Sequence, residues 1–383
     1  MRRTPDALRD GLAALDAAQL RRRASLPRAG AIDFSSNDYL GLARHPALAK
    51  AMATAAASFG AGSGAAHLVT GHGPEHVALE AELADFVGRE SALLFATGYM
   101  ANLGVVGALV GRGDLVLSDA LNHASLIDAC ALSRAEVQRF PHLDHASAGY
   151  LLADWRAEHP AAAAAIITDA VFSMDGDLAP LPELAACASQ HGAWLLADDA
   201  HGLGVLGAHG RGSCEHFNLD SEAVPVLVGT LGKAFGSFGA FVAGERDLID
   251  WILQKARTYI YTTAPPQPVA AATRAALRLA ESEGWRRTRL LTLISDFRGR
   301  CASAGVPLSN STTPIQPLLL GDSGRALQVS EWLLERGLIV KAIRPPTVPA
   351  GSARLRIALS ARHDDRDIAR LVELLAEALS LFP

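Results

Sequence analysis

The stretch PVLVGTLGKAFG, residues 225–236, runs an apolar strand directly into a lysine that stands between glycines. Five more apolar segments are predicted strands: 92–96 (ALLFA), 115–118 (LVLS), 164–169 (AAIITD), 193–197 (AWLLA) and 240–243 (AFVA). Helical patterns separate them, such as the one that Pro74 opens and Gly88 closes, with apolar Leu79 and Leu83 on one face. Strands that alternate with helices over about 200 residues predict an α/β domain with a largely parallel sheet.

The pattern changes near residue 280. A long Arg-rich helix is predicted over 275–304, followed by strands at 315–320, 338–342 and 354–359 and helices at 323–336 and 364–381. Near the start of the chain, residues 6–23 predict a separate helix. We therefore expect a helical arm over 1–41, a large α/β domain over 42–278 and a smaller α+β domain over 279–383.

The composition of the 383 residues argues against several classes of protein. A net charge of -5 is unlike the basic balance of proteins that bind nucleic acid. The four cysteines lie far apart and form no CxxC pair, which argues against a disulfide framework or a structural zinc site and fits a reducing cytoplasm. No apolar run reaches the ~18 residues of a membrane helix, and the charged start MRRTPDALRDGLAAL lacks the apolar core of a secretory signal. We expect a cytoplasmic protein that binds neither nucleic acid nor membrane.

Only four of the 35 basic residues are lysines, and Lys233 is the one whose neighbours suggest chemistry. The flanking Gly232 and Gly236 let a neighbouring ring approach the backbone closely. A partly desolvated lysine in such a place is a candidate Schiff-base nucleophile. A surface lysine and a phosphate-binding lysine are the alternatives. A Walker A loop requires GxxxxGK[ST], and Leu227 and Ala234 break that pattern.

An acidic pair, Asp198 and Asp199, follows the predicted strand 193–197. The carboxyl ends of strands form the edge where open α/β sheets bind ligands. A buried carboxylate without a partner is costly, so a cation such as a protonated pyridine nitrogen is implied. Metal binding by Asp198, Asp199 and His201 is the competing interpretation. No other cluster has the spacing of metal ligands, and we expect no metal.

Residues 202–207 (GLGVLG) match the dinucleotide-binding pattern GxGxxG. That fingerprint must follow a strand directly and open a helix. Here DDAH (198–201) intervenes and AHGRG (208–212) follows, so a nicotinamide-dependent dehydrogenase remains only a remote alternative.

Three further places carry candidate site residues. The strand 92–96 turns through Thr97 and Gly98 into a helical run, and a helix N-terminus suits a phosphate. His123, in NHAS (122–125), offers a flat ring that a sandwiched cofactor would need. Arg354 and Arg356 share one face of a predicted strand, and arginine is the preferred bidentate partner of a carboxylate.

The stretches DDAH (198–201), TLGK (230–233) and NHAS (122–125) together resemble the α-oxoamine synthase family. These are fold-type I enzymes that use pyridoxal phosphate to condense an amino acid with an acyl thioester, with loss of CO₂. The resemblance extends from FSSNDYLGL (34–42) to the last helix. It implies a large domain with a mostly parallel seven-stranded sheet and a smaller α+β C-terminal domain.

Four more stretches narrow the resemblance: GAGSG (60–64), HLVTGH (67–72), FSMDGD (172–177) and AIRPPTVP (342–349). They are most similar to the members that condense L-alanine with a pimeloyl thioester in biotin biosynthesis. The acyl carrier is either coenzyme A or acyl carrier protein. Synthases of the 2-amino-3-ketobutyrate CoA ligase and 5-aminolevulinate synthase types are the alternatives within the family.

The resemblance also implies roles for single residues. Lys233 would form the Schiff base, Asp198 would pair with the pyridinium nitrogen, and His201 would bond the phenolic oxygen of the ring. His123 would stack on the ring face. The residues implied in phosphate binding are Gly98, Tyr99, Thr230 and, from the partner subunit of a homodimer with shared active sites, Thr262 or Thr263. Those implied in substrate contacts are Asn37, Ser173, Arg356 as the carboxylate clamp, Thr347, and more weakly Arg21 and Arg344.

Overall fold

The computed structural model describes residues 4–24 and 26–383, and its contacts divide the chain into two compact units. The large unit holds residues 38–173 and 177–288. The small unit holds residues 1–37, 174–176 and 289–383, of which residues 1–3 and 25 lie outside the described residues. Of the predicted arm over 1–41, the residues up to 37 group with the C-terminal part of the chain in this division, and residues 38–41 belong to the large unit. The three domains expected from the sequence stay a prediction.

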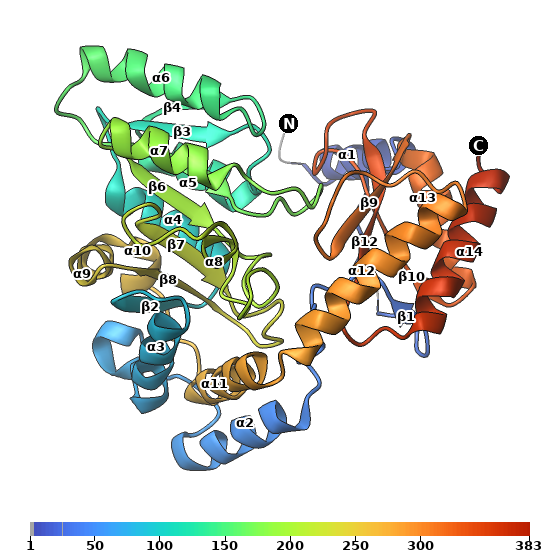
Figure 1. The fold of residues 1–383 in the computed structure, drawn as a ribbon, viewed down its shortest axis with the longest axis horizontal. Coiled ribbons are helices and arrows are strands. Elements are labelled where there is room, and N and C mark those ends of the chain that lie inside the picture. The colour runs from blue at the N-terminus through green and yellow to red at the C-terminus, as the bar shows by residue number, and fades with distance from the viewer. Residues whose placement is uncertain (1–3, 25) are drawn as a thin grey trace. The chain divides into compact units, whose positions relative to one another are not determined.

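The large unit is a seven-stranded sheet between layers of helices (Figure 1). Its strands are β2 (Ser91–Phe95), β3 (Leu115–Asp119), β4 (Glu136–Phe140), β5 (Ala164–Asp169), β6 (Trp194–Asp198), β7 (Val226–Thr230) and β8 (Ala240–Gly244). They are ordered β2-β8-β7-β6-β5-β3-β4, and β8 alone runs antiparallel to its neighbours. This confirms the predicted mostly parallel seven-stranded sheet.

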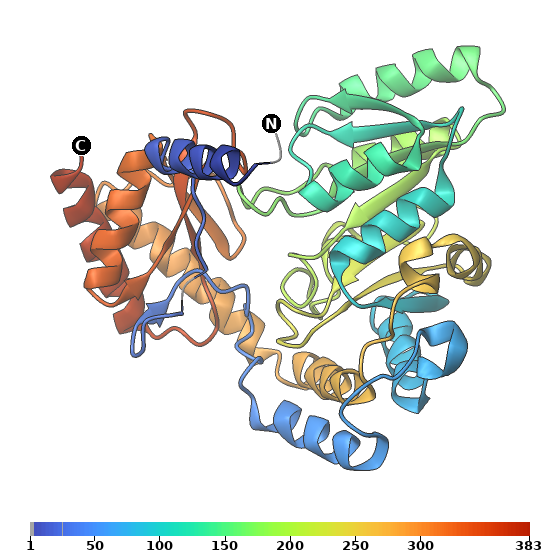
Figure 2. The ribbon, with the colours of Figure 1, turned by 180° about the vertical axis from the view of Figure 1, so that it is seen from behind.

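Helices pack on both faces of this sheet, as the opposite views in Figures 1 and 2 show. The helices of the large unit are α2 (Pro46–Phe59), η1 (His67–Gly71), α3 (Pro74–Phe86), α4 (Gly98–Leu109), α5 (Ala124–Ser133), α6 (His145–Glu158), α7 (Leu181–Gln190), α8 (Ser213–Phe217), α9 (Arg246–Lys255), α10 (Arg257–Ile260) and α11 (Gln267–Ser282). One core joins α4, α5, α9 and α10 to the sheet through side chains such as Val105, Leu126 and Ile252. α7 covers the face opposite to α4 and α5.

The parallel strands end on the same side of the sheet, so their last residues, which are polar, lie together at the carboxyl ends of the strands. β3, β5 and β6 end at Asp119, Asp169 and Asp198, and β7 ends at Thr230. Asp169 is in register with Asp198, and Asp198 with Val228. The interiors of these strands are buried and mostly apolar, so the sheet is a rigid support for the groups at this end of its strands.

The small unit is an α+β layer built from both ends of the chain. Its elements are α1 (Pro5–Ala17), β1 (Ile32–Asp33), β9 (Ile315–Gly321), α13 (Ser323–Glu335), β10 (Leu338–Ile339), β11 (Lys341–Ile343), β12 (Ala353–Ala358) and α14 (Asp365–Leu381). β11, β12 and β9 form an antiparallel sheet, and β1 pairs in parallel with β10. α12 (Trp285–Ser303) begins in the large unit and continues into the small one.

Three predicted elements differ from the structure. The helix predicted over 6–23 ends at Ala17, because Gln19 takes a left-handed conformation with φ of 56°. The single helix predicted over 275–304 is two helices, α11 and α12, separated at Glu283 and Gly284. The single strand predicted over 338–342 is two short strands, β10 and β11. In addition, β4 is a strand that the sequence pattern does not predict. None of the described helices is long and apolar enough to cross a membrane.

Candidate active site

Lys233 lies in the turn that follows β7, in contact with a histidine. Its Nζ is 2.9 Å from Nε2 of His201, and Nδ1 of His201 is 2.7 Å from the hydroxyl of Tyr39. Tyr39 is fully buried and His201 is nearly so. The three side chains form a continuous polar chain that fixes the position of the lysine amine.

Asp198 ends β6 and is held by uncharged donors. Its Oδ2 accepts a hydrogen bond of 2.7 Å from the amide of Asn102, and its Oδ1 accepts one of 3.0 Å from the backbone N–H of Ala200. The Asn102 amide also donates to the hydroxyl of Ser125 at 2.9 Å. Asp198 is only 6 % exposed, so this carboxylate is fixed in a site that favours a cationic ligand.

His123 precedes α5 and belongs to the same group of residues. Its Nδ1 lies 2.7 Å from the hydroxyl of Ser125, and its backbone N–H donates to Oδ2 of Asp169 at 2.6 Å. Burial lowers the pKa of His123, the charge of Asp198 opposes that shift, and the charge of Lys233 adds to it. The imidazole is therefore neutral near pH 7 and available as an uncharged ring.

Asp169 and Asp198 end neighbouring strands as two buried carboxyl groups. Burial and the charge of Asp198 raise the pKa of Asp169 well above its ordinary value, while Lys233 opposes the shift. The amide oxygen of Asn102 is buried without a hydrogen-bond partner among the described residues. A ligand that brings a positive N–H group would compensate the excess of acceptors here. Pyridoxal phosphate has such a group in its protonated ring nitrogen, so the residues present fit this cofactor.

The residues predicted to bind phosphate lie at the ends of elements in the large unit. Gly98 and Tyr99 open α4, whose N-cap is Thr97, and an N-terminus of this kind attracts an anion. The hydroxyl of Tyr99 contacts Asp128. Thr230 ends β7 and donates to the carbonyl of Gly239 at 3.2 Å.

Thr262 and Thr263 follow α10. The Thr262 hydroxyl donates to the carbonyl of Thr258 at 2.5 Å, and Thr263 forms a β-bridge with Ala66. Their contribution to a partner subunit stays a prediction.

Ser173 belongs to a loop of the large unit that a histidine fixes in place. His142 lies 2.9 Å from both Asp119, at the end of β3, and Asp177, on the far side of the loop. Burial disfavours its charged form, but the hydrogen bonds to the two carboxylates outweigh burial and raise the pKa of His142 to about 9. The cation joins the loop to the edge of the sheet.

The other predicted substrate residues belong to the small unit. Arg356 lies on β12 and is buried, with only 6 % exposed. Arg344 donates to the carbonyl of Gln19, and Arg22 donates to the hydroxyl of Thr347 at 2.8 Å. The structure therefore joins the 344–347 loop to the segment after α1. Arg21, in that segment, forms an ion pair with Asp16 at 2.6 Å. Asn37 is the last residue of the first stretch of chain that belongs to the small unit.

Two sequence patterns that suggest ligand binding, Asp199 of the acidic pair and residues 202–207, have structural roles instead. Asp199 is fully buried and accepts hydrogen bonds from the backbone and hydroxyl of Ser213, both at 2.6 Å. Burial raises its pKa to about 7, with Ser213 opposing the shift. Residues 202–207 form turns and do not open a helix, which agrees with rejecting the dinucleotide-binding pattern.

Three residues of the site escaped the sequence analysis. In the sequence, Tyr39 is only one residue of FSSNDYLGL, Asn102 lies in the helical run that follows Gly98, and Asp169 is the end of a predicted strand. The sequence does contain a signal for Asp169. It is an acidic residue at the carboxyl end of a predicted strand, as Asp198 is directly after the strand 193–197. Tyr39 and Asn102 carried no such signal.

Comparison with known proteins identifies the family. Residues 29–375 match the family described as aminotransferase class I and II. The chain is 58% identical over 347 residues to the 8-amino-7-oxononanoate synthase of Cellvibrio japonicus, covering 91% of this chain and 86% of that protein.

Solved structures agree with this result. A serine palmitoyltransferase from S. paucimobilis, solved with a bound PLP–myriocin aldimine, matches with a TM-score of 0.91 and 29% identity over 98% of both chains. The 8-amino-7-oxononanoate synthase from Francisella tularensis matches with a TM-score of 0.79 and 30% identity over 92% of this chain and 99% of that one. The chain therefore belongs to the aminotransferase class I and II family and, within it, to the 8-amino-7-oxononanoate synthases.

Proposed function

We propose that this protein is a pyridoxal-phosphate-dependent acyltransferase that makes 8-amino-7-oxononanoate for biotin biosynthesis. Its substrates are L-alanine and a pimeloyl thioester, and its other products are CO₂ and the free thiol. The observation that carries the proposal is the contact of Lys233 with His201 beside the fixed carboxylate of Asp198. The family assignment supplies the reaction in which such a lysine works.

The cofactor is pyridoxal phosphate, and the residues of the large unit suit each part of it. Lys233 would hold its aldehyde carbon, Asp198 its ring nitrogen, and His201 its phenolic oxygen, with His123 against the ring face. The N–H groups at Gly98 and Tyr99 and the hydroxyl of Thr230 would take the phosphate. When bound, the cofactor withdraws electrons from the amino-acid Cα.

Lys233 is the proton carrier of the proposed reaction. Its Nζ accepts the Cα proton of alanine, which leaves Cα free to form a bond to the thioester carbonyl as the thiolate departs. Lys233 returns a proton to the same carbon once the carboxyl group has left as CO₂. His201 and Tyr39 keep the amine in place between the two transfers.

The remaining residues bind and orient the substrates. Arg356 offers a bidentate partner for the alanine carboxylate, and Asn37 and Ser173 complete the contacts of that substrate. Arg344, Thr347 and Arg21 are assigned to the acyl substrate, in agreement with the hydrogen bonds that join the 344–347 loop to the segment after α1.

We place the enzyme in the cytoplasm as a homodimer in which Thr262 or Thr263 of the partner subunit completes the phosphate site. The compartment is supported by the cysteines: Cys130, Cys187, Cys214 and Cys301 are all free. The acyl carrier is coenzyme A or acyl carrier protein, and assays with both carriers decide between them.

The test is an assay of thiol release with L-alanine and a pimeloyl thioester on either carrier. The purified enzyme should absorb at roughly 400–430 nm from the Schiff base of the cofactor. Lys233→Ala should lose this band and at least about 10²–10⁴-fold in turnover. Near wild-type turnover by this variant would overturn the mechanism. A preference for glycine or serine with short acyl chains would instead indicate another α-oxoamine synthase.

A further inference from the structure

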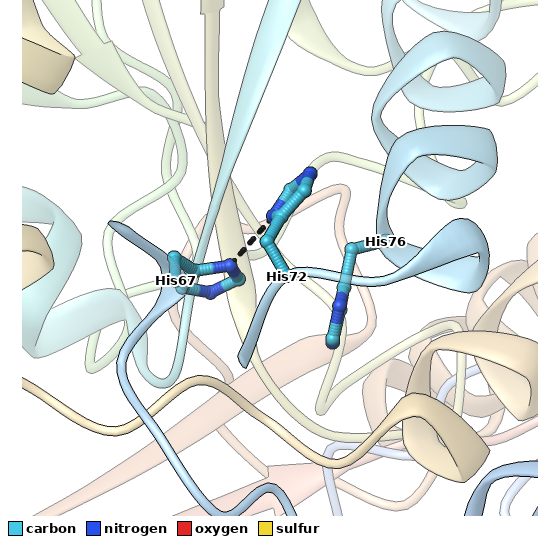
Figure 3. A group of neighbouring side chains, drawn as sticks. All are labelled: His67, His72 and His76. Atoms are coloured by element: carbon cyan, nitrogen blue, oxygen red, sulfur yellow. Dashed lines mark hydrogen bonds between the residues drawn. The ribbon is translucent and has the colours of Figure 1, made fainter. Parts of the chain in front are cut away.

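Three histidines that have no role in the proposed reaction meet in the large unit, beside the 263–265 segment. His67 begins η1, His76 lies in the first turn of α3, and His72 lies between the two helices (Figure 3). One ring nitrogen from each lies within 4.8 Å of one from the others. The three ring centroids form a compact triangle with sides of 5.0, 5.1 and 5.4 Å. The sequence analysis found no cluster with metal-ligand spacing outside residues 198–201, so this group is new.

Burial favours the neutral form of each of the three imidazoles. Burial lowers the pKa of His67 to about 3, with His76 and His72 adding to the shift. Burial also lowers the pKa of His72 and of His76. Neutral imidazoles carry the lone pairs that a divalent transition metal needs as ligands.

The Nε2 atom of His76 has a hydrogen-bond partner of the kind that orients metal-binding histidines, and the Nε2 atom of His72 faces a carboxyl group beyond hydrogen-bond distance. Nε2 of His76 donates to the carbonyl of Pro265 at 2.7 Å, which leaves the lone pair on Nδ1. Nε2 of His72 faces Oε2 of Glu80 at 3.6 Å, and Oε1 of Glu80 is held by the N–H of Leu94 at 3.0 Å. A backbone carbonyl and a carboxylate behind ligating histidines are typical of zinc sites.

His67 supplies a second, independent indication. It is only 6 % exposed and its ring stacks on Tyr259 at 4.8 Å, yet its Nε2 has no hydrogen-bond partner among the described residues. Its Nδ1 lies 2.8 Å from Nδ1 of His72. Only one proton can lie between the two facing Nδ1 atoms, so a shared metal ion would use both of their lone pairs, while Nε2 of His67 would keep its place without a hydrogen bond.

The distances suit a small tetrahedral ion. Two nitrogens that each lie 2.0–2.1 Å from a tetrahedral zinc ion are about 3.4 Å apart. The facing Nδ1 atoms of His67 and His72 are 2.8 Å apart, and one ring nitrogen of each histidine lies within 4.8 Å of the others, a range that includes this value. The ion would replace the His67–His72 hydrogen bond and the one that Nδ1 of His76 accepts from Gly73 at 3.0 Å.

We propose that His67, His72 and His76 bind one zinc-like divalent ion, with water as the fourth ligand and Glu80 orienting His72. The ion would tie η1 to the first turn of α3. It would also brace the 263–265 segment, through the hydrogen bond of His76 to Pro265 and the bridge between Ala66 and Thr263. The site is structural and separate from the reacting groups.

The experiment is a Co²⁺ titration of the tag-free, chelator-treated holoenzyme, followed by competition with Zn²⁺. We expect one ion per chain and the intense visible bands of tetrahedral cobalt, which Zn²⁺ abolishes. His72→Gln should weaken binding at least tenfold. Glu80→Gln, which removes only the orienting carboxylate, should weaken it about 10–100-fold.

His216→Gln is the matched control, because His216 is an exposed histidine on α8 outside the cluster. It should bind Co²⁺ as the wild type does. The absorbance of the bound cofactor reports that each variant is folded, independently of the metal. The proposal is overturned by no binding in the wild type, by weak octahedral bands, or by folded His72→Gln and Glu80→Gln variants that bind as tightly as the wild type.

Discussion

Tyr39 is a positioning residue for the catalytic lysine, acting through His201. Tyr39→Phe removes the hydroxyl 2.7 Å from Nδ1 of His201 and leaves a buried ring nitrogen without its partner. Such a loss costs about 1–3 kcal/mol, so kcat should fall roughly 5–100-fold and its pH profile should shift, with the cofactor still bound. Steady-state rates across pH measure both effects. Tyr150→Phe, at an exposed tyrosine on α6, should change neither.

His142 makes a pH-dependent contribution to stability. Its pKa rises from 6.5 to about 9 on folding, so the charged form is favoured in the folded protein. The stabilisation is therefore complete below about pH 6.5 and disappears as the pH rises through about 9.

His142→Gln should lower the free energy of unfolding by about 1–3 kcal/mol near pH 6, and by much less at pH 10. Urea unfolding at the two pH values measures the difference. His216→Gln should show no such dependence. An equal loss for His142→Gln at both pH values would contradict the role of its charge.

At the residue scale, the sequence predicts a group when its residue type and spacing are rare. Lys233 stands out among four lysines, and Asp198 and His201 follow a strand directly, so all three were found. Tyr39 is 162 positions from His201, and only folding brings their side chains together. His67, His72 and His76 are close in sequence, but their spacing of five and four residues crosses η1 and a turn. A helical pattern does not describe that geometry.

The turn between β7 and β8 must keep its glycine at position 236. Gly236 has φ of 61°, and an added Cβ would lie 2.2 Å from the backbone N of Ala43. Gly236→Ala should therefore destabilise the protein by about 2–4 kcal/mol and weaken cofactor binding, since the same turn holds Lys233.

Gly232→Ala is the matched control for stability in the same turn. A Cβ at position 232 meets its nearest atom, the carbonyl oxygen of Ser237, at an ordinary 3.6 Å. Urea unfolding of the two variants should differ by about 2 kcal/mol or more. Equal unfolding midpoints would show that Ala43 yields to the new methyl group.

At the scale of elements, buried strands were predictable and exposed ones were not. The interior strands β5, β6 and β7 are buried and mostly apolar up to their polar ends, and the apolar runs predict them nearly to the residue. β4 lies at the edge of the sheet and carries Glu136, Gln138 and Arg139, so it shows no apolar run. Its place in the sheet comes from pairing with β3, which is a tertiary contact.

At the scale of the whole molecule, one ion pair and two hydrogen bonds hold the segment 174–176 within the small unit. Asp175 forms an ion pair with buried Arg354, and the hydroxyls of Ser311 and Thr313 donate to the carbonyl of Gly176. The sequence pattern instead predicts that this segment lies inside one continuous domain over 42–278. No local pattern reveals such an excursion, because it depends on contacts more than 100 positions away.

Asp175→Asn should leave the charge of Arg354 buried without its partner. Asp175 is about a third exposed, so we expect a loss of about 1–3 kcal/mol in the free energy of unfolding, less than for a fully buried pair. Asp296→Asn breaks the more exposed pair with Arg300 on α12 and should cost less than about 1 kcal/mol. Chemical denaturation compares the two, and equal costs would contradict the importance of burial at Arg354.

The division of the chain has a consequence for protein engineering. Because the units are built from residues 1–37, 38–173, 174–176, 177–288 and 289–383 in alternation, the chain passes from one to the other four times. No single truncation therefore yields either unit intact. A fragment over 289–383 lacks the strand that pairs with β10 and the buried Phe34. A split-protein reporter or a domain exchange that uses the small unit would have to carry the first 37 residues together with the last 95. Circular permutation, which can join these two stretches, is therefore a better approach than truncation.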